Sequence, residues 1–298
     1  MEIMSSRPSE NVGAGSEPVV APSAPSAARA EDAPAVPPRA WDAHTYRRVA
    51  TPQRAWGRGL IAATGLRGDE TLLDAGCGTG ELTRLWAARV PRGRVIGIDA
   101  SPAMVAQVRR ALADLAPRVT VLQGDLAHLD LPDPVDVVVS NAAFHWVLDH
   151  EALFARLFAS LRPGGRLVAQ CAGEGNMDRA LDLTARVADE PEFRGHLHGF
   201  RRPMYYASAA STDRRLRAAG FTRVAAWTHP APVDLGSVGD AHEFLAAVTL
   251  GPHLERLPPR LRERFVERVA RALADRAGRV VLDYVRLDLR ATRPDGGG

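Results

Sequence analysis

The chain of 298 residues carries 38 lysine and arginine side chains, all of them arginine, and 35 acidic ones, with the two signs interleaved along its length. This balance gives no argument for a nucleic-acid partner. Two cysteines exclude a disulfide framework, no apolar run approaches the ~18 residues of a membrane span, and no secretory signal pattern opens the chain, so we expect a cytoplasmic protein with no membrane partner.

Residues 1–38 are rich in Ser, Pro, Ala, Glu and Gly and have almost no large apolar side chains to bury. Such a segment cannot offset the entropy lost on ordering, so we predict a disordered tail there. A folded domain is expected over 39–292, followed by a flexible tail over 293–298.

Apolar runs and helical patterns alternate through the first half of this domain, about 39–172. The patterns predict helices over 53–64, 81–88, 101–115 and 149–161, and strands over 71–74, 94–98, 118–122, 135–140 and 166–171. Ser101-Pro102 is a good helix start, because a capping hydroxyl precedes a proline at the first helical position. Five apolar strands with intervening helices predict a mainly parallel sheet with helices on both faces.

The second half, about 173–292, has a different pattern. It is irregular and partly helical over 173–206, then predicts a short helix over 212–219 and a strand over 221–229. Two helical stretches, 238–250 and 259–277, precede a last strand over 280–289. We expect the final two strands to form an antiparallel edge, and the intervening helices to form a lid or a dimer surface.

The loop over 74–80, Asp-Ala-Gly-Cys-Gly-Thr-Gly, follows the first strand and indicates a ligand lying against it. Glycines let a backbone approach a ligand closely and adopt positive φ. The dinucleotide pattern G-x-G-x-x-G fails, since its third position falls on Glu81, and the lysine of a phosphate-binding loop is absent. Asp99 ends the second strand, where a carboxylate can accept two hydrogen bonds from a ribose diol.

Four segments in order, 73–80, 95–101, 124–126 and 161–165, resemble the motifs of class I S-adenosylmethionine-dependent methyltransferases, and the resemblance covers about residues 40–172. Within that class, Trp41-Asp42-Ala43-x-x-Tyr46 and Phe144-His145-Trp146-Val147-x-Asp149-His150 look like the trans-aconitate methyltransferase branch and related small-molecule enzymes. The resemblance implies a Rossmann-like, doubly wound α/β fold with a mainly parallel seven-stranded sheet, an antiparallel final strand and helical lid insertions. The two halves then become a cofactor half and a substrate half.

The resemblance also implies S-adenosylmethionine as the cofactor and a set of residues around it. These are Gly76, Gly78 and Gly80 at its amino-acid part with Asp74 positioning it, Asp99 on the ribose, Ala100 and Met104 towards the adenine, Asp125 on the adenine amino group with Leu126 against the ring, and Asn141 and Ala142 facing the cofactor from the fourth strand.

Candidate substrate residues each have a second interpretation. His145 is placed to act as a general base for a hydroxyl or amine acceptor, or is a packing residue. Phe144 and Trp146 wall the pocket or belong to the core, Tyr46 closes over the cofactor or staples a helix, and Arg201 and Arg202 clamp a carboxylate or form an exposed turn. His196 and His198 have no third ligand at a suitable spacing, so no metal is expected.

These residues predict methyl transfer to a small-molecule acceptor at a carboxylate or hydroxyl oxygen. Two alternatives stay open: a catalytically silent regulatory protein that binds S-adenosylmethionine, and a C- or N-methyltransferase of a natural-product pathway. Methylation of nucleic-acid or protein amines is disfavoured, because 140–144 read Ser-Asn-Ala-Ala-Phe instead of Asn/Asp-Pro-Pro-aromatic. The protein is expected to be a monomer or a homodimer.

Overall fold

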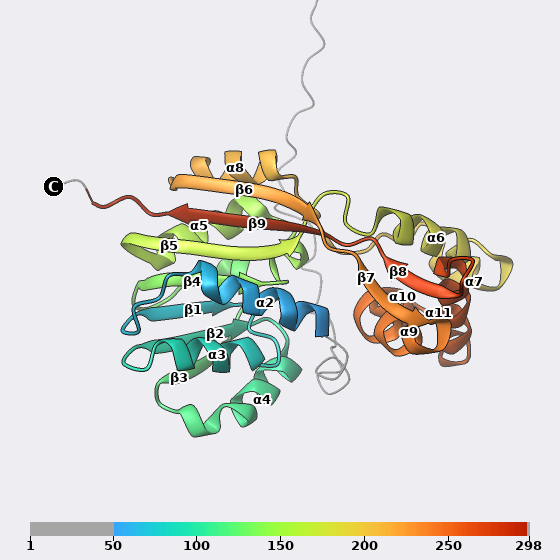
Figure 1. Ribbon diagram of the computed structural model, residues 1–298, viewed down its shortest axis with the longest axis horizontal. Helices are drawn as coiled ribbons and strands as arrows, with labels where there is room; N and C mark the ends of the chain where they lie inside the picture. The colour runs from blue at the N-terminus through green and yellow to red at the C-terminus, as the bar shows by residue number, and fades with distance from the viewer. Residues whose placement is uncertain (1–50, 297–298) are drawn as a thin grey trace, which may run out of the picture. The chain divides into compact units, whose positions relative to one another are not determined.

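The computed structural model describes residues 51–296 (Figure 1). The predicted disordered tail over 1–38, and the predicted site residues Trp41 and Tyr46, lie outside the described residues.

Within the described residues, seven strands form one sheet in the order β3-β2-β1-β4-β5-β9-β6. Strands β1 to β5 are parallel to one another, whereas β9 is antiparallel to both β5 and β6. The predicted mainly parallel sheet with an antiparallel final strand is therefore confirmed. The strands are β1 Thr71–Ala75, β2 Arg94–Asp99, β3 Val119–Gln123, β4 Val135–Asn141, β5 Leu161–Ala172, β6 Thr222–Pro230 and β9 Val285–Thr292.

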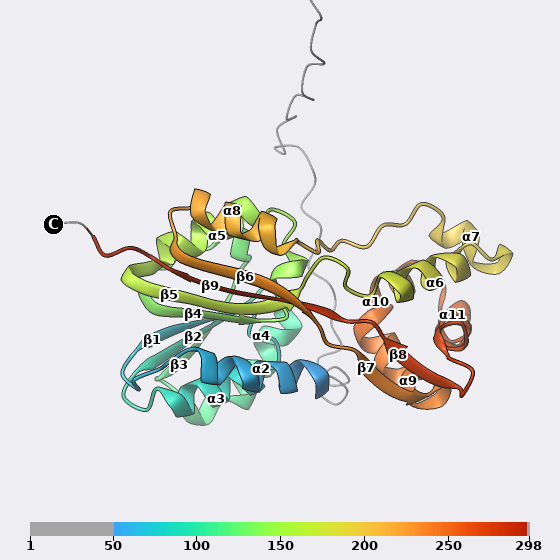
Figure 2. The ribbon, with the colours of Figure 1, turned by 45° about the horizontal axis from the view of Figure 1, so that its top comes forward.

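Helices cover both faces of this sheet, with α2 and α3 on one face and α5 and α8 on the other (Figure 2). The central strand β4 is rich in valine, and its four valines are fully buried, as expected for a parallel strand packed on both faces. No helix among residues 51–296 has the length and apolar character to cross a bilayer. The elements are α2 Thr51–Ala63, α3 Glu81–Arg89, α4 Pro102–Ala111, α5 His150–Ser160 and α8 Ala209–Ala218, with short 3₁₀ turns η2 Ala113–Leu115, η3 Leu126–His128 and η4 Phe144–Trp146.

The second half adds a helical layer with its own apolar core, which we call the lid (residues 177–200 and 233–282). Its core includes Phe193, Phe244 and Phe265. The lid contains α6 Asp178–Ala188, α7 Pro191–Leu197, β7 Val233–Ser237, α9 Val238–Phe244, the π-helical turn Leu245–Thr249, α10 Gly251–Arg256, α11 Pro259–Leu273 and β8 Arg279–Leu282.

The last strand departs from the prediction, because the continuous strand expected over 280–289 is two strands. Strand β8 pairs with β7, which the sequence did not predict, in a separate two-stranded sheet, and β9 joins the main sheet. Asp283 lies at the break, where its carboxylate accepts hydrogen bonds from the backbone N–H groups of Arg179 and Ala180 at the start of α6. The strand is therefore interrupted at Asp283, whose carboxylate pairs with backbone N–H groups in the first turn of α6 that have no partner within the helix.

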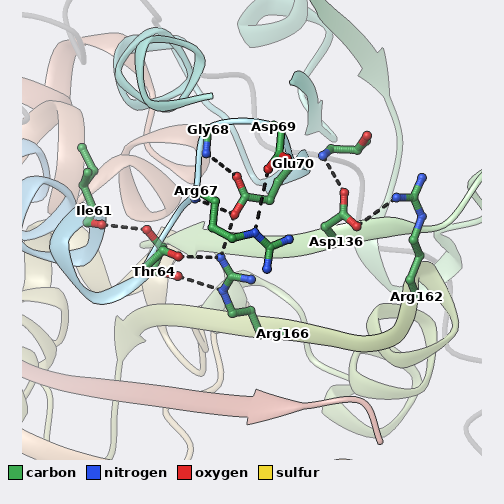
Figure 3. A network of polar contacts seen from close by, with 11 residues as sticks. Ile61, Thr64, Arg67, Gly68, Asp69, Glu70, Asp136, Arg162 and Arg166 are labelled. Atoms are coloured by element: carbon green, nitrogen blue, oxygen red, sulfur yellow. Dashed lines mark hydrogen bonds and ion pairs between the residues drawn. The ribbon is translucent and has the colours of Figure 1, made fainter. Parts of the chain in front are cut away.

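Polar contacts fix the N-terminal ends of the central strands, at the edge opposite the candidate site (Figure 3). Glu70 is 1% exposed and accepts hydrogen bonds from the backbone N–H groups of Arg67 and Gly68, both at 2.8 Å, and from Arg166 at 3.2 Å. Burial acts to raise the pKa of Glu70, but these hydrogen bonds outweigh it and lower the pKa to about 2. The network ties the loop before β1 to β5.

Hydrogen bonds to the rest of the fold continue past the predicted domain end at 292, to Arg293 and Pro294. The carbonyl of Arg293 accepts from the N–H of Gly164 at 3.0 Å, and its side chain donates to the carbonyls of Phe158 at 3.0 Å and Leu161 at 2.6 Å. The Arg293 side chain therefore caps the carbonyl groups at the C-terminal end of α5, although the sequence predicted a flexible tail from 293 on.

Candidate active site

In the glycine loop between β1 and α3, two glycines lie close against other side chains and one borders open space. Gly76 and Gly80 have φ of 83° and 82°, and a Cβ added to either one lies 2.2 Å from a side-chain carbon, of Ala143 and of Val108 respectively. Gly78 also has positive φ, at 54°, but an added Cβ meets nothing within 4 Å. Of the three, only Gly78 has open space beside its Cα, so the backbone there has room for a ligand.

Two carboxylates lie beside this loop. Asp74 is 3% exposed and accepts a hydrogen bond from the Thr83 hydroxyl at 2.7 Å. Asp99 accepts from the backbone N–H groups of Gly78 and Ser101, both at 2.9 Å. Burial and the charge of Asp99 raise the pKa of Asp74 to about 7, and burial also raises the pKa of Asp99. A pair of crowded acids favours a cationic ligand and disfavours a phosphate.

The end of β4 presents an acceptor to the same region. The Asn141 side chain donates from Nδ2 to the Gln53 carbonyl at 2.9 Å, while its Oδ1 is buried without a hydrogen-bond partner among the described residues. Ala142 follows with φ of 60°, and its N–H donates to the Gln170 carbonyl at 2.7 Å. A left-handed residue other than glycine is strained, and such strain clusters at binding sites.

The predicted adenine-side residues follow β2 and β3 in the chain, with Met104 in α4, and they differ in exposure. Ala100 is exposed, as is Asp125, whose Oδ1 accepts from the N–H of Ala127 at 3.0 Å. Met104 is 3% exposed and Leu126 6% exposed. Leu126 belongs to the apolar core beside the main sheet, so its side chain packs inside the fold below this region.

A small cavity of about 40 Å³ lies where the carboxyl ends of β4 and β5 meet the lid. His145, Trp146 and Arg202, which the sequence proposed for catalysis or substrate binding, all line it, as does Ala142. The remaining lining residues are Gln53, Ala172, Asn176, Met177, Met204, Tyr206, Val248, Thr249, Tyr284 and Arg286.

Two predicted substrate residues do not line this cavity. Phe144 is fully buried in the core and packs edge-on against Phe154 with ring centres 6.2 Å apart, because the tight turn η4 directs it inward and its two successors towards the cavity. Arg201 is exposed, in contrast to Arg202 beside it. The pocket interpretation is thus corrected for Phe144 and Arg201.

His145 is a neutral hydrogen-bond donor in this geometry. Its Nδ1 accepts from the N–H of Ala172 at 3.4 Å, which places the ring proton on Nε2. Burial, followed by the positive charges of Arg286 and Arg202, lowers the pKa of His145 well below its usual value. With Nδ1 engaged and a proton already on Nε2, the ring is suited to donate a hydrogen bond and poorly suited to act as a general base.

Arg286, on β9, is the residue of the site that sequence reasoning missed most clearly. It is 1% exposed, its guanidinium carbon lies 4.2 Å from the centre of the Trp56 ring, and its Nε donates to Gln170 Oε1 at 3.3 Å. Gln170 in turn donates to Asp288 at 2.8 Å. The available signal was the alternation of β9, where Arg286, Asp288 and Arg290 share one face, but nothing local marks Arg286 as buried.

Arg202 and Thr249 complete a wall of hydrogen-bond donors. Arg202 has its Nε and Nη1 buried without a partner among the described residues, and the same holds for Thr249 Oγ1. No carboxylate is present in the cavity lining that the structure describes, whereas Arg202 and Arg286 both are. A guanidinium offers donors in a planar fork that matches a carboxylate, so the cavity is suited to an anionic ligand.

Comparisons with known proteins found relatives of this chain. Residues 72–165 match the model of a family described as a methyltransferase domain. The trans-aconitate 2-methyltransferase of Methylobacterium nodulans is 33% identical over 269 residues, covering 85% of this chain and 98% of that protein, and that of Deinococcus radiodurans is 33% identical over 263 residues, covering 86% and 99%. The solved YcgJ protein of Bacillus subtilis shares the fold, with a TM-score of 0.55 at 16% identity over 81% of this chain and all of that one.

Proposed function

Because the chain belongs to the trans-aconitate 2-methyltransferase family of S-adenosylmethionine-dependent methyltransferases, we propose that it methylates a carboxylate oxygen of a small polycarboxylic acid, with trans-aconitate as the first acceptor to test. The observation that carries this proposal is the cavity beside Ala142. It combines the guanidinium groups of Arg202 and Arg286 with the donor His145, and its described lining has no carboxylate. A cationic amine acceptor would be repelled by this wall, whereas a carboxylate is attracted to it.

The residues around the glycine loop fit the family's cofactor. We assign Asp74, Asp99 and the buried Asn141 Oδ1 to its cationic amino-acid part and its ribose, since all three are acceptors and both acids carry raised pKa values that a cation would lower. The open space at Gly78 leaves room for a ligand against the backbone. S-adenosylmethionine supplies a methyl group already activated by a sulfonium.

The chain's own contribution is then alignment and exclusion of water. A carboxylate acceptor is ionised at neutral pH and needs no general base, which agrees with the neutral, proton-bearing His145. We assign Nε2 of His145 to one oxygen of the reacting carboxylate, leaving the other oxygen to attack. Holding the reactants in line can lower the barrier by ~7 to 11 kcal/mol.

The test is methyl transfer to trans-aconitate by the purified protein, followed by mass spectrometry of the product ester. Arg202→Met is expected to raise the KM for trans-aconitate by about 30-fold or more, because truncating one member of a buried charged pair costs ~2 to 5 kcal/mol. The matched control is Arg201→Met, which removes the same charge from an exposed neighbour and is expected to leave KM unchanged. Binding of S-adenosylmethionine without transfer to any carboxylic acid would favour a silent binding protein instead.

A further inference from the structure

The lid contains a π-helical turn, and this turn lies where the lid meets the cavity. Leu245–Thr249, between α9 and α10, forms a π-helical turn in which the N–H of Leu250 donates to the carbonyl of Leu245 at 2.7 Å, five residues back. Such turns are rare and occur frequently at functional sites, because the extra residue changes which side chains share a face. Here Val248 and Thr249, at the end of the turn, both line the cavity.

Thr249 is bonded differently from an ordinary helical threonine. In α6, the hydroxyl of Thr184 donates to the carbonyl of Ala180 at 2.7 Å, the usual bond to the preceding turn. Thr249 is 3% exposed, yet its Oγ1 has no partner among the described residues. A buried hydroxyl without a partner is unfavourable, so its persistence at a cavity wall indicates a partner that arrives with the ligand.

Arg202 supplies the second half of the same wall. Its Nε and Nη1 are also buried and without a partner among the described residues, and it lines the same cavity as Thr249. Together the two side chains offer three donors from the lid and from the segment before α8. A carboxylate that accepts all three has both oxygens engaged and is a poor nucleophile.

We propose that Thr249 and Arg202 form a subsite for a substrate carboxylate other than the one that is methylated, so that Thr249 determines specificity for polycarboxylic acids. The inference rests on the proposed function and deepens it. In this arrangement His145 donates a hydrogen bond to the carboxylate that is methylated, and Arg202 and Thr249 bind a second carboxylate of the same substrate.

The experiment compares Thr249→Val, which keeps the shape and removes the hydroxyl, with Thr249→Ser, which keeps the hydroxyl. The matched control is Thr212→Val on α8, whose buried hydroxyl also lacks a partner among the described residues but lies away from the cavity. Two quantities are measured for each variant: the KM and kcat with trans-aconitate, and the Kd of trans-aconitate by calorimetry with S-adenosylhomocysteine bound, where no turnover occurs.

Thr249→Val is expected to raise both KM and Kd by about 10-fold or more, because a hydrogen bond to a charged group is lost, with kcat nearly unchanged. Thr249→Ser is expected to stay within about 3-fold of the wild type, and Thr212→Val to leave both constants unchanged. The double variant Thr249→Val/Arg202→Met is expected to lose less than the product of the single losses, since both side chains bind one carboxylate.

Equal Kd values for the wild type and Thr249→Val, with S-adenosylhomocysteine still bound normally, would overturn the subsite while leaving the proposed function intact. Multiplicative losses in the double variant would also overturn it, because the two side chains would then act on separate groups. If the wild type neither binds nor methylates trans-aconitate or another polycarboxylic acid, the proposed function fails and this inference fails with it.

Discussion

Burial of the Asp74 carboxyl group disfavours its ionised form, and replacing it by asparagine tests the electrostatics of the proposed cofactor site. Burial, opposed by the hydrogen bond from Thr83 and reinforced by the charge of Asp99, raises the pKa of Asp74 from 3.8 to about 7. A shift of ~3 pKa units corresponds to about 4 kcal/mol against the ionised form. Asparagine has the same shape and still accepts from Thr83, but it has no charge to lose.

The sign of the effect follows from the two pKa values. Between about pH 4 and 7, the folded protein keeps a proton on Asp74 that the unfolded chain has released. The contribution of this group to the free energy of unfolding therefore falls as the pH rises through that window, and it stays low above it. In Asp74→Asn no carboxyl group ionises at this position. We therefore expect the free energy of unfolding of the variant, relative to that of the wild type, to rise by up to about 4 kcal/mol from near pH 4 to near pH 8.

The assay is urea unfolding of the ligand-free wild type and Asp74→Asn near pH 4 and near pH 8. Calorimetry of S-adenosylmethionine binding, in two buffers of different ionisation enthalpy, gives the second measurement. Below pH 7 the wild type is expected to release a proton from Asp74 on binding, because a cationic ligand favours the ionised carboxylate. Asp74→Asn is expected to bind more weakly and to release fewer protons, since only Asp99 is left to ionise. An unfolding free-energy difference between the two proteins that is the same at both pH values would refute the reasoning.

Three further outcomes are expected. Glu70→Gln should lose about 3 kcal/mol of stability at neutral pH, because backbone hydrogen bonds overcome the effect of burial and lower the pKa of Glu70 to about 2; the deficit should vanish as the pH falls towards 2, and a deficit constant with pH in urea unfolding would contradict this. Gly76→Ala, whose new methyl group lies 2.2 Å from Ala143, should lower both the melting temperature and cofactor affinity, whereas Gly78→Ala should mainly lower affinity in calorimetry. His145→Gln keeps a donor and should lower kcat by less than ~10-fold, while a loss of ~10² to 10⁴ would assign His145 as a general base.

The order of strands and helices through the first half could be predicted because its signals are local. Valine runs such as β4, the capping Ser101 before Pro102 and the glycine loop over 74–80 each depend on residues close together in sequence. Motif spacing also placed Asp74 and Asp99 at neighbouring strand ends, because parallel strands bring their carboxyl ends to one edge.

Some residues close together in the chain looked equivalent in the sequence but differ in burial in the structure. Phe144 lies in the core and Trp146 on the cavity, because a single 3₁₀ turn directs them apart. Arg201 is exposed whereas Arg202 reaches the cavity. No periodic pattern distinguishes the members of either pair, since each lies in a short turn or an irregular segment.

The substrate wall shows most clearly what only the tertiary structure decided. Arg202, Thr249 and Arg286 are far apart in the chain and meet because β9 inserts between β5 and β6 while the lid packs over the carboxyl edge of the sheet. Backbone periodicity, and with it helices, strands and the glycine loop, is written in local sequence. Which side chain of a strand or turn faces a cavity depends on long-range packing. The sequence by itself therefore determined the glycine loop and the two acids beside it, while the fold decided which charged and polar side chains line the cavity.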